Sequence, residues 1–157
     1  MSGNGYPAWL SQTPIHHIAK GNGHVGEFRV QDGQLFVCQG CCCGNADRGF
    51  APVPIGEFKD QWKQRKLRRR LHLTISGCLG PCTMANVVLL NFGGRSTWLH
   101  SIDAASDVTL IYDYAEAMLH AQRWLVPPPG LQGRHFQRYL VDSIEQACHE
   151  ADALLST

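Results

Sequence analysis

The stretch LHLTISGCLGPC, residues 71–82, runs from a strand pattern straight into a pair of cysteines. Its first six residues alternate apolar and polar side chains, and this period of two predicts a half-buried β-strand. The glycines and the proline of SGCLGPC predict a tight loop after that strand. Cys78 and Cys82 are therefore expected just past the carboxyl end of a strand.

Upstream, the apolar run GQLFVC, residues 33–38, predicts a short buried strand that ends at Cys38. Between the two strands, Pro54 suits the first turn of a helix, and apolar residues then recur at helical spacing, which predicts a helix over residues 55–70. A strand–helix–strand unit is right-handed almost without exception. We therefore expect the two strands to be parallel, with the helix on one face of the sheet.

Downstream of the cysteine loop, the pattern predicts two further strands and two helices. NVVLLNF (86–92) is a near-continuous apolar run typical of a central strand, and TWLHSI (97–102) is expected to return as its antiparallel neighbour after the turn GGRS. The helix that follows should have Ser106 as its N-cap and cover the other face or an end of the sheet. After VPPPGLQG, a last helix is expected over about 140–155, with Cys148 as a buried structural thiol.

These elements predict a small α/β sandwich with extensions at both ends. Residues 1–32, rich in Gly, Asn, Gln and His without a sustained period, are expected to form a loosely structured N-terminal extension. Residues 33–125 form the predicted folded domain. Residues 126–157 are expected to hold a Pro-rich linker and the C-terminal helix.

The composition is that of an ordinary globular protein, with 157 residues, 44% hydrophobic side chains and a net charge near +1. No apolar run approaches the roughly 18–20 residues of a membrane span, and the N-terminus shows no secretory signal. We therefore expect a cytoplasmic protein. Because that compartment is reducing, the seven cysteines favour metal binding or redox chemistry over disulfide bonds.

Half of the basic residues lie in one short run. Seven of the fourteen Lys and Arg residues fall in KDQWKQRKLRRR, between Lys59 and Arg70. Such a run forms either a solvated helix face or a docking patch for an acidic partner. Trp62 is the single aromatic residue within it, which argues against nucleic-acid recognition.

The predicted topology brings two groups of cysteines together. Parallel strands place their carboxyl ends at the same edge of the sheet, so Cys38 should lie close to Cys78 and Cys82. Four thiolates are needed for a tetrahedral zinc ion or for a 2Fe–2S cluster. The run CQGCCCGN leaves the fourth ligand open between positions 41, 42 and 43, all of them cysteines.

The choice of the fourth cysteine separates two kinds of site. Pairing Cys38 with Cys41 gives C-x2-C, the spacing favoured by zinc sites. Pairing Cys38 with Cys43 gives C-x4-C, which spreads two ligands over a bridged pair of irons.

With Cys43, the whole pattern is C-x4-C-x34-C-x3-C. It resembles the thioredoxin-like 2Fe–2S ferredoxins, including the peripheral 2Fe–2S subunit of respiratory complex I, in both cysteine pairs and in the CLGPC loop. The resemblance covers roughly residues 34–123. It implies a thioredoxin-like βαβ-ββα fold, one-electron transfer and, for stand-alone members, a homodimer. It also implies a 2Fe–2S cluster bound by Cys38, Cys43, Cys78 and Cys82. The chain departs from the family in its run of three adjacent cysteines, which leaves Cys41 or Cys42 as substitutes for Cys43.

A shorter match, GCCCG followed by SGCLGPC, resembles small ferredoxins encoded with cobalamin-synthesis and cobalt-chelatase genes. The first hypothesis is therefore a 2Fe–2S ferredoxin that passes single electrons to a larger partner enzyme in corrinoid metabolism, with the Lys59–Arg70 run as its docking face. The alternative is a zinc- or cobalt-binding module, structural or metal-handling, that is accessory to a metal chelatase. A third is a subunit-type interaction domain with a structural cluster. No catalytic triad, paired carboxylates, P-loop or dinucleotide fingerprint is visible, so we expect no enzyme activity of its own.

Overall fold

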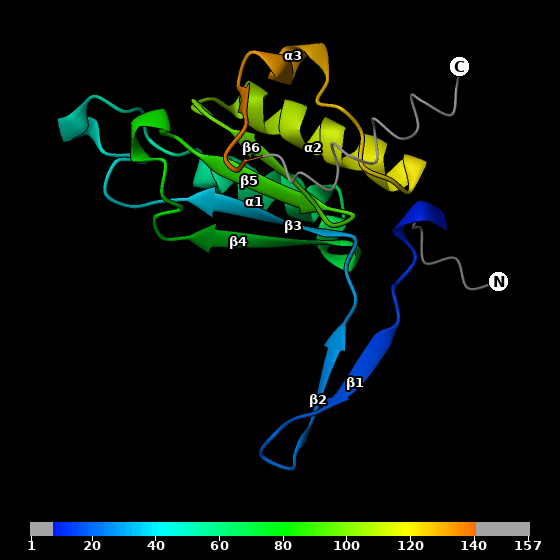
Figure 1. The fold of residues 1–157 in the computed structure, drawn as a ribbon. Helices are drawn as coiled ribbons and strands as arrows, with labels where there is room; N and C mark the ends of the chain where they lie inside the picture. The colour runs from blue at the N-terminus through cyan, green and yellow to red at the C-terminus, as the bar shows by residue number, and fades with distance from the viewer. Residues whose placement is uncertain (1–7, 141–157) are drawn as a thin grey trace, which may run out of the picture.

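The structure, a computed structural model, describes residues 8–140 and contains two separate sheets (Figure 1). A two-stranded hairpin stands clear of a five-stranded sheet whose strand order is β4-β3-β5-β6-β7. The strands are β1 Ile15–Ala19, β2 Val25–Arg29, β3 Gly33–Cys38, β4 Leu71–Ser76, β5 Val88–Phe92, β6 Arg95–Leu99 and β7 His135–Phe136. The α-helices are α1 Ile55–Gln64, α2 Ala105–Ala121 and the one-turn α3 Pro129–Gln132, and four short 3-10 helices are η1 Ala8–Leu10, η2 Ala46–Arg48, η3 Leu67–Arg69 and η4 Cys82–Met84.

The βαβ unit has the predicted topology. Strands β3 and β4 are parallel, with Gly33 opposite Leu71 at one end and Cys38 opposite Ser76 at the other. Strand β5 pairs antiparallel with the other side of β3, and β6 follows it as a hairpin neighbour. The mixed α/β class and the βαβ-ββα order are thus confirmed.

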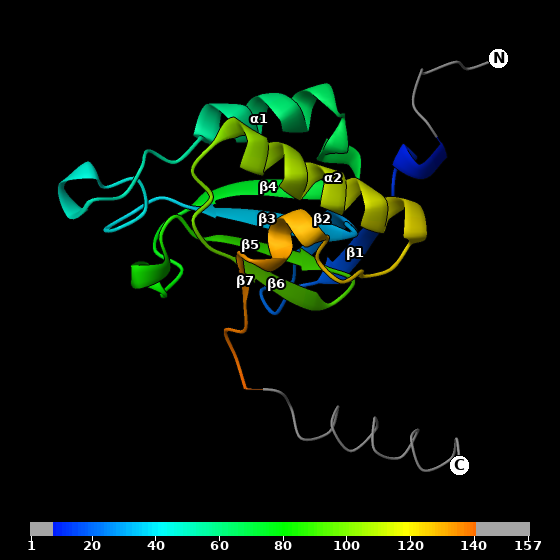
Figure 2. The same ribbon diagram turned by 90° about the horizontal axis from the view of Figure 1, so that it is seen from above.

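Both long helices cover the same face of the sheet (Figure 2), so the expectation that α2 covers the other face or an end is wrong. The hydroxyl of Tyr112 on α2 donates a hydrogen bond of 2.6 Å to the carbonyl of Phe58 on α1. The reason lies in the strands. Leu35 and Leu90 face the helices and are fully buried, whereas the other face carries a polar row across the sheet. That row is Gln34, His72, Asn91 and Ser96.

The first helix is shorter than predicted. It ends at Gln64 instead of continuing to residue 70, because Lys66 adopts a left-handed conformation with φ of 58°. The chain then forms η3, which turns Leu67 into the core with no exposed surface. The predicted single basic helix is therefore a helix, a turn and a 3-10 helix.

The second helix begins one residue before the predicted N-cap. Ser106 is exposed within the first turn, and the backbone N–H groups of Asp103 and Ala104 instead donate to Asp107, at 3.0 and 2.9 Å. Asp107 also pairs with Arg134 at 2.7 Å, which ties the start of α2 to the segment before β7. A carboxylate at this position suits the helix dipole and the unsatisfied N–H groups of the first turn.

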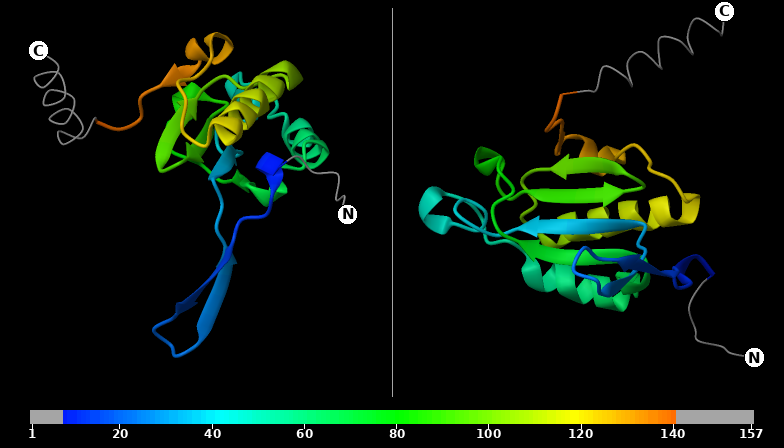
Figure 3. Two further views of the ribbon diagram at one scale, coloured as in Figure 1. Left: turned by 90° about the vertical axis from the view of Figure 1, so that its right-hand side faces the viewer. Right: turned by 60° about the horizontal axis from the view of Figure 1, so that its bottom comes forward.

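Two expectations about the extensions change. Residues 15–29, predicted to be loosely structured, form the projecting hairpin β1-β2 (Figure 3). Residues 126–136 are more than a linker, because they include α3 and add β7 to the edge of the sheet beside β6. The helix predicted over about 140–155, with Cys148, lies outside the described residues. Within residues 8–140, no helix is both long and apolar enough to cross a membrane.

Candidate metal centre

The carboxyl ends of β3 and β4 form one edge of the sheet, and six cysteines meet there. A narrow hollow of about 10 Å³ is lined by these thiols together with Leu79, Gly80, Pro81 and Val87. The cysteines are Cys38, Cys41, Cys42, Cys43, Cys78 and Cys82, and all six are free thiols. The topological prediction that the strand ends bring Cys38 close to the second cysteine pair is therefore confirmed.

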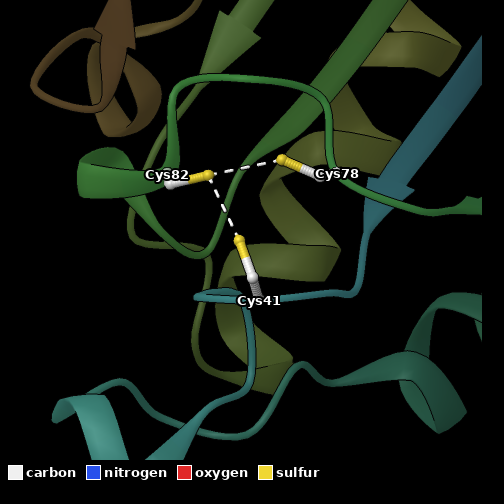
Figure 4. A group of neighbouring side chains, drawn as sticks. All are labelled: Cys41, Cys78 and Cys82. Atoms are coloured by element: carbon white, nitrogen blue, oxygen red, sulfur yellow. Dashed lines mark hydrogen bonds between the residues drawn. The ribbon is translucent and has the colours of Figure 1, made fainter.

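Three of the sulfur atoms form a compact group (Figure 4). The Sγ of Cys82 lies 3.3 Å from that of Cys78 and 3.4 Å from that of Cys41. All three sulfur atoms lie within 4.8 Å of one another. Because each sulfur can supply one ligand, this group is able to hold a metal ion.

Cys38 and Cys43 lie deeper in the same site, at 3% and 4% exposure. Cys43 and Cys78 are both close enough to Cys38 to raise its pKa. The backbone N–H of Val87 donates to the Sγ of Cys43 at 3.4 Å. All four cysteines predicted as ligands are thus at this edge.

Cys42 is directed differently from its two neighbours. Its thiol is buried and accepts a hydrogen bond of 3.3 Å from the guanidinium of Arg48 on η2. The sulfur of Cys42 is therefore paired with a guanidinium group, whereas the sulfur of Cys41 is paired with another thiol. Among the three adjacent cysteines, Cys42 is therefore the least suited to bind a metal together with Cys78 and Cys82.

Backbone N–H groups lie near several of the sulfur atoms. The N–H of Val87 donates to Cys43. The backbone of Leu79 acts to lower the pKa of Cys38, and that of Gly80 to lower the pKa of Cys78. Such donors stabilise the negative charge of a thiolate.

Two loops carry the thiols, and specific contacts fix the conformation of each loop. Gly80 has a φ of 115°, which only glycine adopts easily, and this lets the chain turn between Cys78 and Cys82. The buried side chain of Asn86 accepts a hydrogen bond of 2.7 Å from the N–H of Gly44 and donates to the carbonyl of Ala51 and the carboxylate of Asp103. Asn86, which lies just before β5, therefore holds the loop that follows the cysteine run, at Gly44 and Ala51.

The proximity of the thiols changes their proton affinities. Burial, with a smaller effect of Cys43, raises the pKa of Cys38 to about 11. Hydrogen bonds from Cys78 and then Cys41 raise the pKa of Cys82 to about 12. The hydrogen bond with Cys82 and the N–H of Gly80 lower the pKa of Cys78. Of these three thiols, Cys78 therefore ionises first. Cys38 and Cys82 stay protonated until a metal ion binds their sulfur atoms and displaces the protons.

Trp98 and Arg138 lie beside the cysteines, and the sequence patterns did not predict either of them as part of the site. Trp98 is 4% exposed and packs in one cluster with Cys38, Cys42 and Cys43. Its indole N–H is buried without a hydrogen-bond acceptor among residues 8–140. The guanidinium of Arg138 lies 5.8 Å from the centre of the Trp98 ring, and it occupies the space that a side chain at Gly80 would need. Arg138 follows β7 and comes here only through tertiary folding.

The fold and the site together define a mixed α/β domain with a group of free thiols able to bind a metal at one edge of its sheet. No family model and no curated protein matches the chain.

Solved structures do match. A thioredoxin-like [2Fe-2S] ferredoxin from Aquifex aeolicus is 19% identical, with a TM-score of 0.45 over 69% of this chain and 100% of the ferredoxin. A second structure of a thioredoxin-like [2Fe-2S] ferredoxin from that organism is 16% identical, with a TM-score of 0.46 over 71% of this chain and 96% of the other.

Proposed function

We propose that this protein is a 2Fe–2S electron carrier that passes single electrons to a larger enzyme and has no catalytic activity of its own. The observation that supports this proposal best is the convergence of Cys38, Cys43, Cys78 and Cys82 in one hollow, where the backbone N–H of Val87 donates to the sulfur of Cys43. A cluster with four thiolates is an anion, and it becomes more negative on reduction. Backbone donors and a buried indole N–H suit such a group.

The proposed ligands are Cys38, Cys43, Cys78 and Cys82. The cluster would supply one-electron oxidation and reduction, while the chain supplies the thiolates, the N–H donors and the shielding by Trp98. Cys41 is the competitor for the place of Cys43, because its sulfur already lies beside Cys82. Cys42, hydrogen-bonded to Arg48, is expected to stay outside the ligand set.

Electron exchange should take place at the cysteine edge, where Cys41 and Cys78 are exposed. The basic run was predicted to dock the redox partner, but η3 directly precedes β4 and lies at its opposite end (Figure 1). Six residues at about 3.3 Å each make these strands about 17–20 Å long. Because electron transfer slows steeply with distance, we propose that the partner's redox centre approaches the cysteine edge and not the basic run.

The second candidate is a site for a single zinc or cobalt ion, as in the metal-handling alternative. The group of Cys41, Cys78 and Cys82 favours it, because three sulfur atoms within 4.8 Å of one another suit one tetrahedral ion.

The electron-carrier proposal has three further parts. They are a partner enzyme in corrinoid metabolism, a cytoplasmic location and a homodimer. The free thiols within residues 8–140 support a reducing compartment.

The deciding experiment is the ultraviolet–visible spectrum of anaerobically purified protein before and after dithionite, with iron, sulfide and zinc counted on the same sample. Equal amounts of iron and acid-labile sulfide, with visible bands that bleach on reduction, would support the electron carrier. A colourless protein that carries zinc, and that iron and sulfide fail to reconstitute, would establish the single-ion site instead.

A further inference from the structure

The hairpin β1-β2 exposes apolar side chains that a stable soluble domain would be expected to bury. Four of the seven large apolar side chains that are exposed in residues 8–140 belong to it. They are Ile15, Ile18, Val25 and Phe28, with exposures of 46–67%. The strand register places Ile18 and Phe28 on one face of the hairpin, and Ile15 and Val25 on the other. A two-stranded hairpin is marginally stable in water by itself, and a group of exposed apolar side chains marks an interaction site.

The hairpin has a firm base despite its projection (Figure 3). The N–H of Val30 donates to the carbonyl of Pro14 at 3.0 Å, which closes the two strands at their lower end. Next to this pair, the guanidinium of Arg70 binds both carboxylate oxygens of Asp32 and also donates to the carbonyl of Trp9 at 2.9 Å. Arg70, directly after η3, therefore anchors the chain on both sides of the hairpin.

A basic groove of about 610 Å³ lies at that base, between the hairpin and the end of α1. Its lining combines five cationic side chains and Trp62 with no acidic residue. The cations are Arg29, Lys63, Lys66, Arg68 and Arg69. The indole N–H of Trp62 donates to the carbonyl of Leu71 at 2.8 Å, so the ring is fixed as part of the wall. A concave surface lined by one sign of charge attracts groups of the opposite sign.

We propose that the hairpin and this groove together form a docking surface for an extended, acidic segment of a partner protein. Carboxylates of the segment pair with the groove cations, and its apolar side chains cover Ile18 and Phe28. Both outer edges of the hairpin lack a partner strand among the described residues, so an extended segment can also add to the two-stranded sheet.

The apolar side chains beside the groove favour a peptide segment over a nucleic acid or a phosphate compound as its ligand. A nucleic acid or a small phosphate compound would pair with the cations but leave Ile18 and Phe28 in water. None of the groove cations is buried, so the groove offers no enclosed site for one compact phosphate. A segment that carries both carboxylates and apolar side chains satisfies both halves of the surface.

This surface and the cysteine edge lie at opposite ends of β3 and β4. A partner bound here leaves the thiol edge accessible. The proposal therefore assigns attachment and electron exchange to different ends of one domain, and it does not depend on which metal group the thiols hold.

The test uses the full-length protein with its thiol site loaded, and a fluorescently labelled synthetic peptide that alternates glutamate with leucine or valine. Fluorescence anisotropy at low salt should show binding that weakens as salt rises, because exposed charge pairs are screened. Lys63→Glu and Arg68→Glu should each weaken binding by about tenfold or more. Lys59→Glu is the matched control, because Lys59 is exposed in the same run but does not line the groove.

The hairpin half of the surface is tested in the same assay. Ile18→Ser and Phe28→Ser should each weaken peptide binding several-fold, while Val126→Ser, which changes an equally exposed apolar residue elsewhere, should leave it unchanged. Circular dichroism on each variant confirms that the domain is folded. Binding that is absent at low salt, or equal for the groove variants and Lys59→Glu, would overturn the proposal. So would tighter binding of an oligothymidylate or of inorganic triphosphate in the same groove.

Discussion

The sulfur of Cys41 lies 3.4 Å from the sulfur of Cys82, while the sulfur of the neighbouring Cys43 faces Val87 and Cys38. Two residues apart in one tight loop, these cysteines thus approach the same site from its exposed and its buried side. Either can complete a set of four thiolates with Cys38, Cys78 and Cys82. Substitution of single cysteines decides between them.

Cys78→Ser should reduce the iron and sulfide of reconstituted protein to background, because Cys78 belongs to every ligand set that this site allows. Cys42→Ser should retain both, since the sulfur of Cys42 is hydrogen-bonded to Arg48. Cys41 and Cys43 compete for the fourth ligand position. Cys43→Ser should cause the larger loss of iron and sulfide, and Cys41→Ser the smaller loss. Iron and sulfide analysis with the visible spectrum measures all four variants. Equal loss from Cys78→Ser and Cys42→Ser would refute the assignment.

Metal uptake by the metal-free protein should release protons and become tighter as pH rises. The pKa of Cys38 is raised to about 11 and that of Cys82 to about 12, so both thiols are protonated at neutral pH and must lose a proton to bind. The apparent affinity should then rise by about tenfold per pH unit for each proton released. Titration calorimetry with Zn²⁺ in buffers of different ionisation enthalpy counts the protons. An affinity that is constant between about pH 6 and pH 8 would contradict this expectation.

Trp98→Phe should leave the cluster bound but shift its reduction potential to more negative values. The buried indole N–H of Trp98 lacks an acceptor in the described part of the chain and packs with the cysteines. A hydrogen bond to sulfur favours the reduced, more negative state, and phenylalanine cannot donate one. A redox titration followed by electron paramagnetic resonance measures the shift. Trp124→Phe is the control, because the Trp124 indole donates to Thr97 instead.

Asp107→Ala should lower the free energy of unfolding by about 2 kcal/mol, since it removes both a helix-capping carboxylate and the ion pair of Arg134, which keeps its hydrogen bond to the Ser101 carbonyl. Burial alone would raise the pKa of Asp107, but hydrogen bonds from Ala104, Arg134 and Asp103 outweigh it and lower that pKa. The carboxylate therefore stabilises the fold fully above its unfolded pKa of about 3.9, and this stabilisation is lost as pH falls through the lower folded pKa.

Urea unfolding at neutral pH and near pH 3 measures both effects of Asp107. The difference in stability between the native chain and Asp107→Ala should shrink at the acid pH. Asp60→Ala, at an exposed position of α1, is the control and should change the unfolding free energy by less than about 0.5 kcal/mol. A difference that grows on acidification would mean that the carboxylate is not the stabilising species.

Local sequence patterns were enough to predict the elements that position the site. Alternation in LHLTIS and the apolar run GQLFVC identified β4 and β3, and the handedness rule for crossovers made them parallel. That one step brought Cys38 next to Cys78 and Cys82 across a large sequence separation. The glycine and proline positions likewise identified the loop that carries the second cysteine pair.

Patterns failed where a long-range contact outweighed local preference. The basic run reads as one helix, but burying Leu67 requires the break at Lys66. The hairpin in residues 15–29 has no clean alternation, because apolar side chains stand on both of its faces and none enters the core. The side of the sheet chosen by α2 depends on which strand faces are apolar after pairing, and no single strand contains that information.

The amino-acid sequence by itself determined the strand order of the βαβ unit, the loops with the cysteines and the edge of the sheet where thiols meet. Only the tertiary structure decided how the three adjacent cysteines divide, with Cys41 toward Cys82, Cys42 toward Arg48 and Cys43 toward Val87. The physical reason is that consecutive side chains in a tight turn point in different directions. Their partners come from three other segments of the chain, which meet only after the sheet has formed.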